Sequence, residues 1–458
     1  MKKIALFCIV LFSISCSNDD QDTAALTVTV QPIESLQVTI NWTFTGGNGQ
    51  TLYRVLLNDV VYEEAFSGTQ YTFEIQNETA YNGVIYAISE NGDETFATFN
   101  FTTVGSEIWY GDAKIFLGFQ SENYPYRIVT GTFTITGDWN HISDLAGLEE
   151  VGNLHIRNVQ NTTNLNGLSH LRFYNDNFGR IRIEECNDLT DVSAITQLKP
   201  FTGTIYLSEN LSLNNLNGLS VVNNGNVTII DMPLTDLSTL QTGTILNVLD
   251  LTGLPNLTSL NGLQNVQQIT KSITLNNLPI TNLDGLGNLS SYGQLRLISL
   301  ANLNSLEALQ GATMLEAPLS LIDLPNLTSL DGLEGVRNIK TSLSLTQIPN
   351  LTDINALLNV ETFRATKSSS TFSRFNFNIG NCNSLQNLDA FQNVRYVGEN
   401  PTREQFGLTI IQNDQLSNFC GFRNYVNSIP TGAIFLWSIY GNLYNPTPPD
   451  IKTGACAQ

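Results

Sequence analysis

Residues 257–263 read Leu-Thr-Ser-Leu-Asn-Gly-Leu, and residues 327–333 read Leu-Thr-Ser-Leu-Asp-Gly-Leu. Looser copies of this motif recur from residue 132 onward, most of them 20 to 27 residues apart. We place the first residues of the twelve copies at Ile142, Thr162, Leu189, Leu213, Leu234, Leu257, Ile280, Leu306, Leu327, Leu351, Leu385 and Leu416. A period of about 20–29 residues with this leucine spacing is typical of a solenoid, because each coil turns its leucines inward and no coil buries them alone.

The residues between the motifs predict β-rich coils. An alternating strand precedes several copies, as in Ser272–Leu275 and Ser342–Leu345, and we find no amphipathic helix of 10–15 residues between strands. Leu254-Pro255-Asn256 places proline and asparagine at a corner, and asparagine and glycine both tolerate positive φ there. Twelve coils stacked at about 4.8 Å would form a rod on the order of 58 Å long.

The ends of such a rod need caps, because a bare terminal coil exposes both core and sheet edge. We assign residues 104–131, which are rich in aromatic side chains, to the N-terminal cap. The repeats then span residues 132–419, and residues 420–458 form the C-terminal cap.

The stretch before the repeats predicts a separate small domain at residues 26–103. It contains about seven short alternating strands with turn signals between them, the size of an immunoglobulin-like sandwich. The expected fold class is therefore all-β: a sandwich followed by a leucine-rich β-solenoid of about twelve coils.

The sandwich region resembles a fibronectin type III domain. The matching residues around its tyrosine corner are Ile75, Thr79, Tyr81, Ile85, Ala87 and Gly92. Trp42 stands where that family buries a strand tryptophan, and Asn77 replaces an expected proline. The resemblance implies that Tyr81 and Trp42 belong to the core and that the domain acts as a spacer.

Residues 130–425 resemble the receptor L-domain-like repeats of bacterial surface proteins and are also similar to internalin-type leucine-rich repeats, as in Leu234–Leu240. Either family implies binding through an exposed sheet face rather than catalysis. The choice between the two families stays open.

The first twenty residues resemble the export signal of a bacterial lipoprotein. Lys2 and Lys3 precede a nine-residue apolar run, and Ser13-Ile14-Ser15-Cys16 is similar to a lipobox. The resemblance implies cleavage after residue 15, acylation of Cys16, and contact with the membrane through the lipid alone. Residues 16–25 would then form an acidic tether similar to the surface-export signal of Bacteroidota lipoproteins, which implies an outer-membrane lipoprotein facing the cell exterior. The alternatives are a secreted protein with a chance cysteine and a plain solvated linker.

Charge and composition exclude several functions for this chain of 458 residues. Its formal charge is −20, and only 14% of its residues are charged. This balance argues against nucleic acids and anionic membrane surfaces as partners. Three histidines and the lack of a catalytic or metal-ligand motif lead us to expect no enzyme, no catalytic residue, no metal and no cofactor. A hydrolase with an unrecognised carboxylate pair remains the alternative.

Four cysteines lie in the repeats and the C-terminal cap. Cys420 and Cys456 both fall in the C-terminal cap, and we expect them to form a disulfide, with two free thiols as the alternative. Cys186 and Cys382 occupy an inward slot of their coils, about 38 Å apart, and are too distant to pair.

The repeat spacing breaks at residues 361–375 and 395–406, where the extra residues predict loops that could lie on a binding face. These loops carry an unusual share of the basic residues, which suggests contact with an anionic partner; loops without a binding role are the alternative. The candidate partner-binding residues are Arg364, Lys367, Arg374, Arg395 and Arg403.

These observations together predict non-catalytic recognition or adhesion at the cell surface, with an unidentified protein or glycan as the partner. A glycan-binding component of a nutrient-uptake system is one alternative. Trp139 takes an inward slot, and Trp109 and Trp437 fall in the caps, which weakens that alternative. A structural spacer at the surface is the other.

Overall fold

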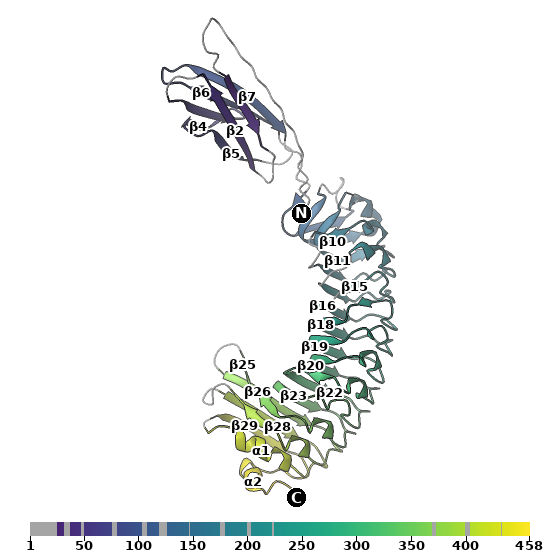
Figure 1. Ribbon diagram of the computed structural model, residues 1–458. Helices are drawn as coiled ribbons and strands as arrows, with labels where there is room; N and C mark the ends of the chain where they lie inside the picture. Colours follow the sequence, from purple (N-terminus) through teal and green to yellow (C-terminus); the bar gives the residue numbers. More distant parts are fainter. Residues whose placement is uncertain are drawn as a thin grey trace. The chain divides into compact units, whose positions relative to one another are not determined.

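The computed structural model describes residues 25–31, 37–46, 50–75, 80–102, 108–118, 126–145, 147–174, 179–198, 203–221, 224–368, 372–398, 404–431 and 433–458. Strands make up 46% and helices 10% of the structure. The chain divides into two compact units, Met1–Ile108 and Trp109–Gln458, and each is described by itself (Figure 1). The predicted signal peptide and Cys16 lie outside the described residues.

The N-terminal unit consists of two antiparallel sheets around one core. The first has the order β1 (Ala25–Val30), β2 (Gln37–Thr45) and β5 (Gln70–Glu74). The second has the order β4 (Val60–Phe66), β3 (Leu52–Leu57), β6 (Ala80–Ile88) and β7 (Glu94–Thr102). Alternation along the strands turns Ile40, Val55 and Ile85 into the core, together with Trp42, which is only 2% exposed.

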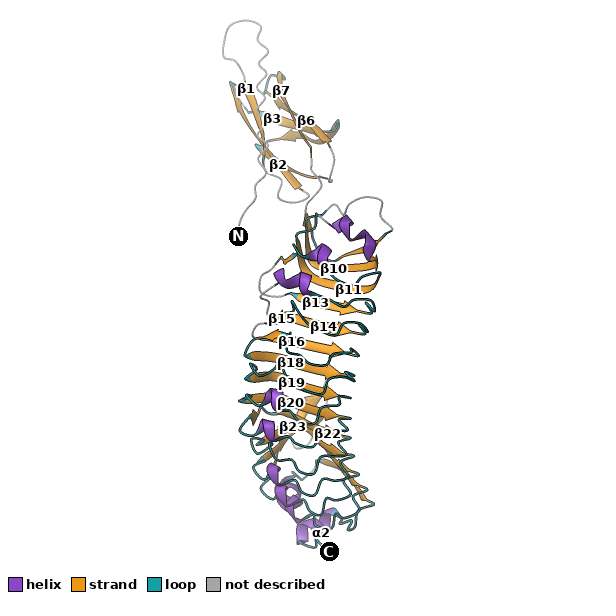
Figure 2. Cartoon of the chain, turned by 90° about the vertical axis from the view of Figure 1, so that its right-hand side faces the viewer, coloured by secondary structure: helices purple, strands orange, loops and turns teal. Residues whose placement is uncertain are grey.

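The C-terminal unit is a β-solenoid in which each long strand pairs in parallel with the next (Figure 2). The strands of this ladder are β9 (Ala113–Leu117), β10 (Ile128–Asp138), β11 (Glu150–Gln160), β13 (Arg180–Glu184), β14 (Thr204–Ser208), β16 (Gly225–Ile230), β18 (Ile245–Thr252), β19 (Gln268–Asn276), β20 (Ser291–Ile298), β22 (Ala317–Ile322), β23 (Asn338–Thr346), β26 (Phe372–Gly380), β28 (Glu404–Ile411) and β29 (Ile434–Tyr440). Shorter strands flank the ladder: β8 (Ile108–Trp109), β12 (Arg172–Phe173), β15 (Ser220–Val221), β17 (Gln241–Thr242), β21 (Thr313–Met314), β24 (Thr362–Arg364), β25 (Thr366–Ser368) and β27 (Arg395–Val397).

The solenoid has about ten turns, fewer than the twelve expected. The first motif copy, at Ile142, is half-buried within the 3₁₀ segment η1 (Trp139–Leu145), and the last copy leads into the helix α1 (Arg423–Ser428).

Aligned columns of apolar side chains hold the coils together. Leu249, Ile273 and Leu295 are register partners on successive strands, and all three are fully buried. The second half of the leucine motif forms a 3₁₀ turn in several coils. These turns are η2 (Asn166–Leu168), η3 (Ser193–Gln197), η4 (Asp284–Leu286), η5 (Glu307–Leu309), η6 (Asn355–Leu357), η7 (Asp389–Phe391) and η9 (Cys420–Phe422). The intervening outward positions of the strands form an exposed sheet face.

The corner after most strands of the ladder is left-handed, and it is not where we expected it. Asn256, in the Leu-Pro-Asn corner, is not among the described residues with positive φ. The residue directly after the strand has positive φ instead, as at Asn277, Ser299 and Asp323. The Asn277 N–H donates to the carbonyl of Ile298 on the next coil at 3.0 Å, and Ser299 repeats this bond. These bonds between coils offset the cost of the left-handed conformation for residues other than glycine.

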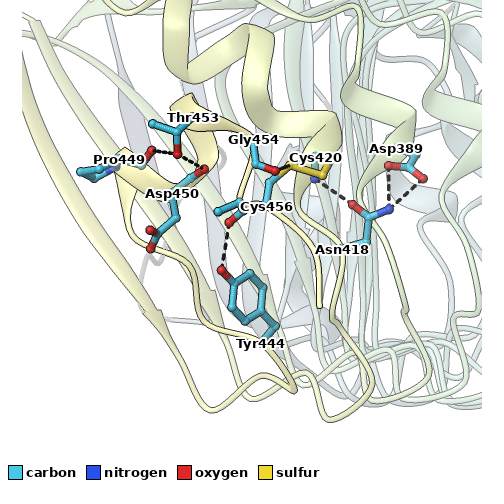
Figure 3. Close-up of a disulfide and its surroundings, with 10 residues drawn as sticks. Asp389, Asn418, Cys420, Tyr444, Pro449, Asp450, Thr453, Gly454 and Cys456 are labelled. Atoms are coloured by element: carbon cyan, nitrogen blue, oxygen red, sulfur yellow. Dashed lines mark hydrogen bonds between the residues drawn. A yellow bond between two sulfur atoms is a disulfide. The ribbon is translucent and has the colours of Figure 1, made fainter.

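The C-terminal cap closes the last coil with two short helices and a disulfide (Figure 3). Cys420 is bonded to Cys456, which follows the helix α2 (Pro448–Thr453). The hydroxyl of Tyr444 donates to the carbonyl of Ala455 at 2.9 Å and holds the end of the segment.

Close stacking of the coils makes Gly332→Ala strongly destabilising. Gly332 has a φ of +110°, and a Cβ there would lie 2.1 Å from the carbonyl oxygen of Leu306 on the preceding coil. We expect a loss of about 2–4 kcal/mol from left-handed strain and overpacking combined, measured by urea unfolding. Gly311→Ala is the control, because Gly311 has a φ of +87° but nothing within 4 Å. Equal losses in the two variants would show that the contact between coils does not matter.

Candidate binding surface on the parallel sheet

A cluster of charged and aromatic side chains lies on the exposed sheet face of three neighbouring coils. His155 on β11, Arg182 on β13 and Tyr206 on β14 are register partners in one row across the strands. Glu184 lies two residues further along β13, in register with Arg157. Alternation places all five side chains on the same face of the sheet. We call these five residues the sheet-face cluster.

Glu184 is the centre of the sheet-face cluster. Its Oε2 lies 2.7 Å from His155 Nε2 and 2.5 Å from Arg182 Nε, and its Oε1 accepts a hydrogen bond from Arg182 Nη2 at 2.8 Å. The Glu184 side chain is only 10% exposed. Both carboxylate oxygens are therefore already engaged, and the carboxylate orients Arg182 and His155.

The guanidinium groups of the cluster remain open to solvent. Arg182 lies over the ring of Tyr206, 4.6 Å from its centroid, while 40% of its side chain is exposed. Arg157 bonds Glu185 at 2.9 Å and is 55% exposed. Arg180 is also exposed on this face and forms no ion pair with a described residue. All three arginine side chains are therefore partly open to solvent.

The charge state of Glu184 favours a structural role over proton transfer. Burial is the largest influence and raises the pKa of Glu184, but hydrogen bonds from Arg182 and His155 together outweigh it and hold the pKa below its usual range. The hydrogen bond to Glu184 raises the pKa of Arg182 in turn. A carboxylate with a lowered pKa is a weak base, so the cluster is poorly suited to general acid–base chemistry at neutral pH.

Glu184 should make stability fall at acid pH. Because its folded pKa lies below its unfolded value of about 4.3, the stabilisation is fully present above that pH and is lost as the pH falls through the folded pKa. We expect Glu184→Gln to flatten the fall in the urea unfolding midpoint between neutral pH and about pH 3. Glu361→Gln is the control, because Glu361 meets Arg337 at 3.6 Å with 64% of its side chain exposed. An unchanged acid slope in Glu184→Gln would contradict this account of the cluster.

The predicted partner-binding residues are only partly placed by the structure. Arg364 ends β24 and pairs with Glu316 at 3.2 Å, and Arg395 begins β27, which pairs with β24. The backbones of Lys367 and Arg374 lie on the paired strands β25 and β26, but their side chains are outside the described residues. Arg403 also lies outside them. The structure thus brings the strands that carry four of the five residues together, and Glu316 partly neutralises Arg364.

The two free cysteines are buried, and His170 bonds to the backbone of another coil. Burial raises the pKa of Cys186 to about 11 and that of Cys382 to about 12, so neither thiol is a ready nucleophile. Both are free and fully buried, as small apolar residues would be. His170 Nε2 lies 2.7 Å from the carbonyl of Leu148.

A shallow polar hollow of about 570 Å³ lies at one side of the middle coils. Its lining residues are uncharged and include Gln264, Asn265, Gln267 and Asn288. Among the described residues, no three His, Cys, Asp or Glu side chains are grouped so as to hold a metal ion. No helix in the described part of the chain is long and apolar enough to cross a membrane.

Sequence reasoning missed the sheet-face cluster, although the signal was present. Arg180-Ile-Arg-Ile-Glu184 alternates charged and apolar residues, and His155-Ile-Arg157 does the same one coil earlier. Aligning these strands by their buried isoleucines brings the charged side chains together. The alignment requires the strand register, which motif spacing alone does not supply.

Comparison with known proteins adds little to these observations. No protein-family model matches the chain, and no curated protein matches it. Among solved structures, the chain is similar to the family 28 exopolygalacturonase of Yersinia enterocolitica at 8% identity, over 81% of this chain and 95% of that chain, with a TM-score of 0.14. A likeness of this size carries no argument about fold or function.

Proposed function

We propose that the protein is a non-catalytic recognition or adhesion protein that binds a protein partner through the exposed face of its parallel sheet. The observation that carries this proposal is the ion-paired arrangement of Glu184, His155 and Arg182 on that face. The arrangement fixes guanidinium groups without using all of their donors. Such groups suit a partner that presents carboxylates.

Preorganisation explains why the cluster would bind rather than merely pair internally. Glu184 and the Tyr206 ring hold Arg182 in one orientation, so less side-chain entropy is lost when a partner binds. Arg180 and Arg157 flank it and contribute further donors. In a chain of charge −20, Arg157, Arg180 and Arg182 offset the nearby Glu184, Glu185 and Glu209, so an acidic partner is repelled less at this face than the net charge would suggest.

We further propose that the two units and the N-terminus have the identities that their sequences resemble. The N-terminal unit is a fibronectin type III-like spacer, an assignment supported by its three- and four-stranded sheets and its buried Trp42. The solenoid belongs to the leucine-rich or receptor L-domain-like repeats, an assignment supported by its buried leucine columns. Residues 1–15 direct export, and acylated Cys16 anchors the protein to the outer membrane, facing the exterior.

A binding screen tests the proposal. The mature chain from Ser17 onward, which keeps every described residue, would be applied to protein and glycan arrays. Arg180→Ala/Arg182→Ala and Arg364→Ala/Arg395→Ala remove equal charge from the two candidate surfaces. We expect saturable binding to acidic proteins that the first double variant loses by at least tenfold and the second retains.

Other outcomes of the screen would overturn parts of the proposal. Loss only in the Arg364/Arg395 variant would move the site to the C-terminal coils. Saturable binding to sugars alone would favour glycan capture for nutrient uptake. No binding by a folded sample would favour the surface-spacer role.

A further inference from the structure

The strand β29 is apolar on both faces. It reads Ile-Phe-Leu-Trp-Ser-Ile-Tyr over residues 434–440 and carries no charged residue. Its outward side chains are largely exposed, with Leu436 at 59% and Tyr440 at 57%. Its inward side chains, including Phe435 and Trp437, are only half-buried. Such a pattern is typical of a strand that is covered on both faces.

One edge of β29 has no partner strand among the described residues. The other edge pairs in parallel with β28, from Gln405 beside Ile434 to Ile411 beside Tyr440. The cap helices α1 and α2 lie against each other, and α1 also lies against β27. Figure 1 shows β29 beside β28 at the C-terminal end of the ladder. Exposed edges in monomeric proteins usually carry charges, prolines or bulges that block pairing, and β29 has none of these along its seven residues.

The charge around β29 permits contact between two copies of the chain. Residues 404–458 contain three acidic side chains (Glu404, Asp414 and Asp450) and two basic ones (Arg423 and Lys452), so this region has a net charge of −1. The whole chain has a net charge of −20. Like-charge repulsion between two copies is therefore weak near this edge.

The sequence of β29 is also self-complementary when two copies of the strand pair in antiparallel orientation. In an antiparallel pairing centred on Trp437, each Phe435 faces the other copy's Ile439, and each Ile434 faces the other copy's Tyr440. Within each contact the two side chains lie on one face of the sheet: the inward face for Phe435 and Ile439, and the outward face for Ile434 and Tyr440. All but the Leu436–Ser438 contact join two apolar side chains, and one such strand supplies both halves of a two-fold interface.

We propose that β29 joins two copies of this chain by antiparallel edge-to-edge pairing, which makes one continuous sheet across the dimer. The pairing satisfies the free backbone groups of the edge and covers Leu436, Tyr440 and the half-buried Trp437. This dimer contact uses a surface other than the sheet-face cluster. The dimer and the proposed function can therefore be tested independently of each other.

Sedimentation equilibrium of the mature chain from Ser17 onward tests this proposal. We expect the wild-type mass to rise to that of a dimer with increasing concentration. Leu436→Lys should weaken the association at least tenfold, because it places a charge in the interface. Leu211→Lys is the matched control, because Leu211 is 62% exposed but lies on a different coil. It should associate as the wild type does.

Circular dichroism and melting would confirm that Leu436→Lys is folded, and Tyr440→Lys would replace it otherwise. A wild-type chain that stays monomeric at high micromolar concentration would overturn the proposal. So would a dimer that both lysine variants of β29 leave unchanged. Equal weakening by Leu211→Lys would also overturn it, because the effect would then come from added charge rather than from the edge.

Discussion

Replacing Phe377 with alanine is expected to lower the free energy of unfolding of the C-terminal coils by about 3–5 kcal/mol. Phe377 is 1% exposed, and its ring centroid lies 4.6 Å from that of Phe422 and 5.5 Å from that of Phe391. Removing the ring leaves a cavity among the neighbouring aromatic rings, and this cavity cannot close unless several coils move. Urea unfolding followed by tryptophan fluorescence would measure the loss, because Trp437 lies in the affected region.

Phe377→Leu is the control for cavity size. Leu343 and Leu408 are the register partners of Phe377 on the neighbouring strands, so leucine already fits this column. We expect a loss of less than about 1.5 kcal/mol for this variant. Because each coil contacts only its neighbours, the alanine variant should unfold its last coils before the rest. A single unfolding transition shifted by the same amount in both variants would contradict this account.

Removing the disulfide should cost about 2–4 kcal/mol of stability at the C-terminal cap. Cys420 and Cys456 are 36 residues apart in sequence, and the bond holds α2 and the final residues against the last coil. We expect Cys420→Ala/Cys456→Ala to lower the first thermal transition, because the cap protects the end of the core.

Reductant provides the control for the disulfide prediction. It should lower the melting temperature of the wild-type chain and leave that of the double alanine variant unchanged. The free thiols Cys186 and Cys382 are fully buried and should contribute nothing to this difference. A wild-type chain insensitive to reductant would show that the cap does not depend on the bond.

The leucine motif predicted the inward residues well, because a solenoid core needs the same residue type at the same place in every coil. It was less reliable for register. We began one copy at Leu306, whereas Leu303 bonds to the carbonyl of Leu300 as Leu257 bonds to that of Leu254. Starting this copy at Leu303 changes its two spacings from 26 and 21 residues to 23 and 24. Because the leucines of the motif lie three residues apart, both Leu303 and Leu306 fit the pattern as the first residue of this copy.

The corners and the binding surface were harder to predict from sequence. The left-handed corner is occupied by Asn277, Ser299, Asp323 and even Gln347, so no residue type marks it. A backbone bond between coils stabilises it instead. The sheet-face cluster likewise depends on residues from three coils, such as His155, Arg182 and Tyr206, that meet only when the register is known.

The central claim is tested most directly by a titration with the strongest protein binder from the array. This binder is titrated against the wild-type chain and against Arg180→Ala/Arg182→Ala, each at low and at high ionic strength. Recognition through the sheet-face cluster predicts that the wild-type affinity falls with added salt. It also predicts that the double variant binds at least tenfold more weakly at low salt. Equal affinities for the two proteins at both ionic strengths would contradict the claim that this face of the sheet recognises the partner.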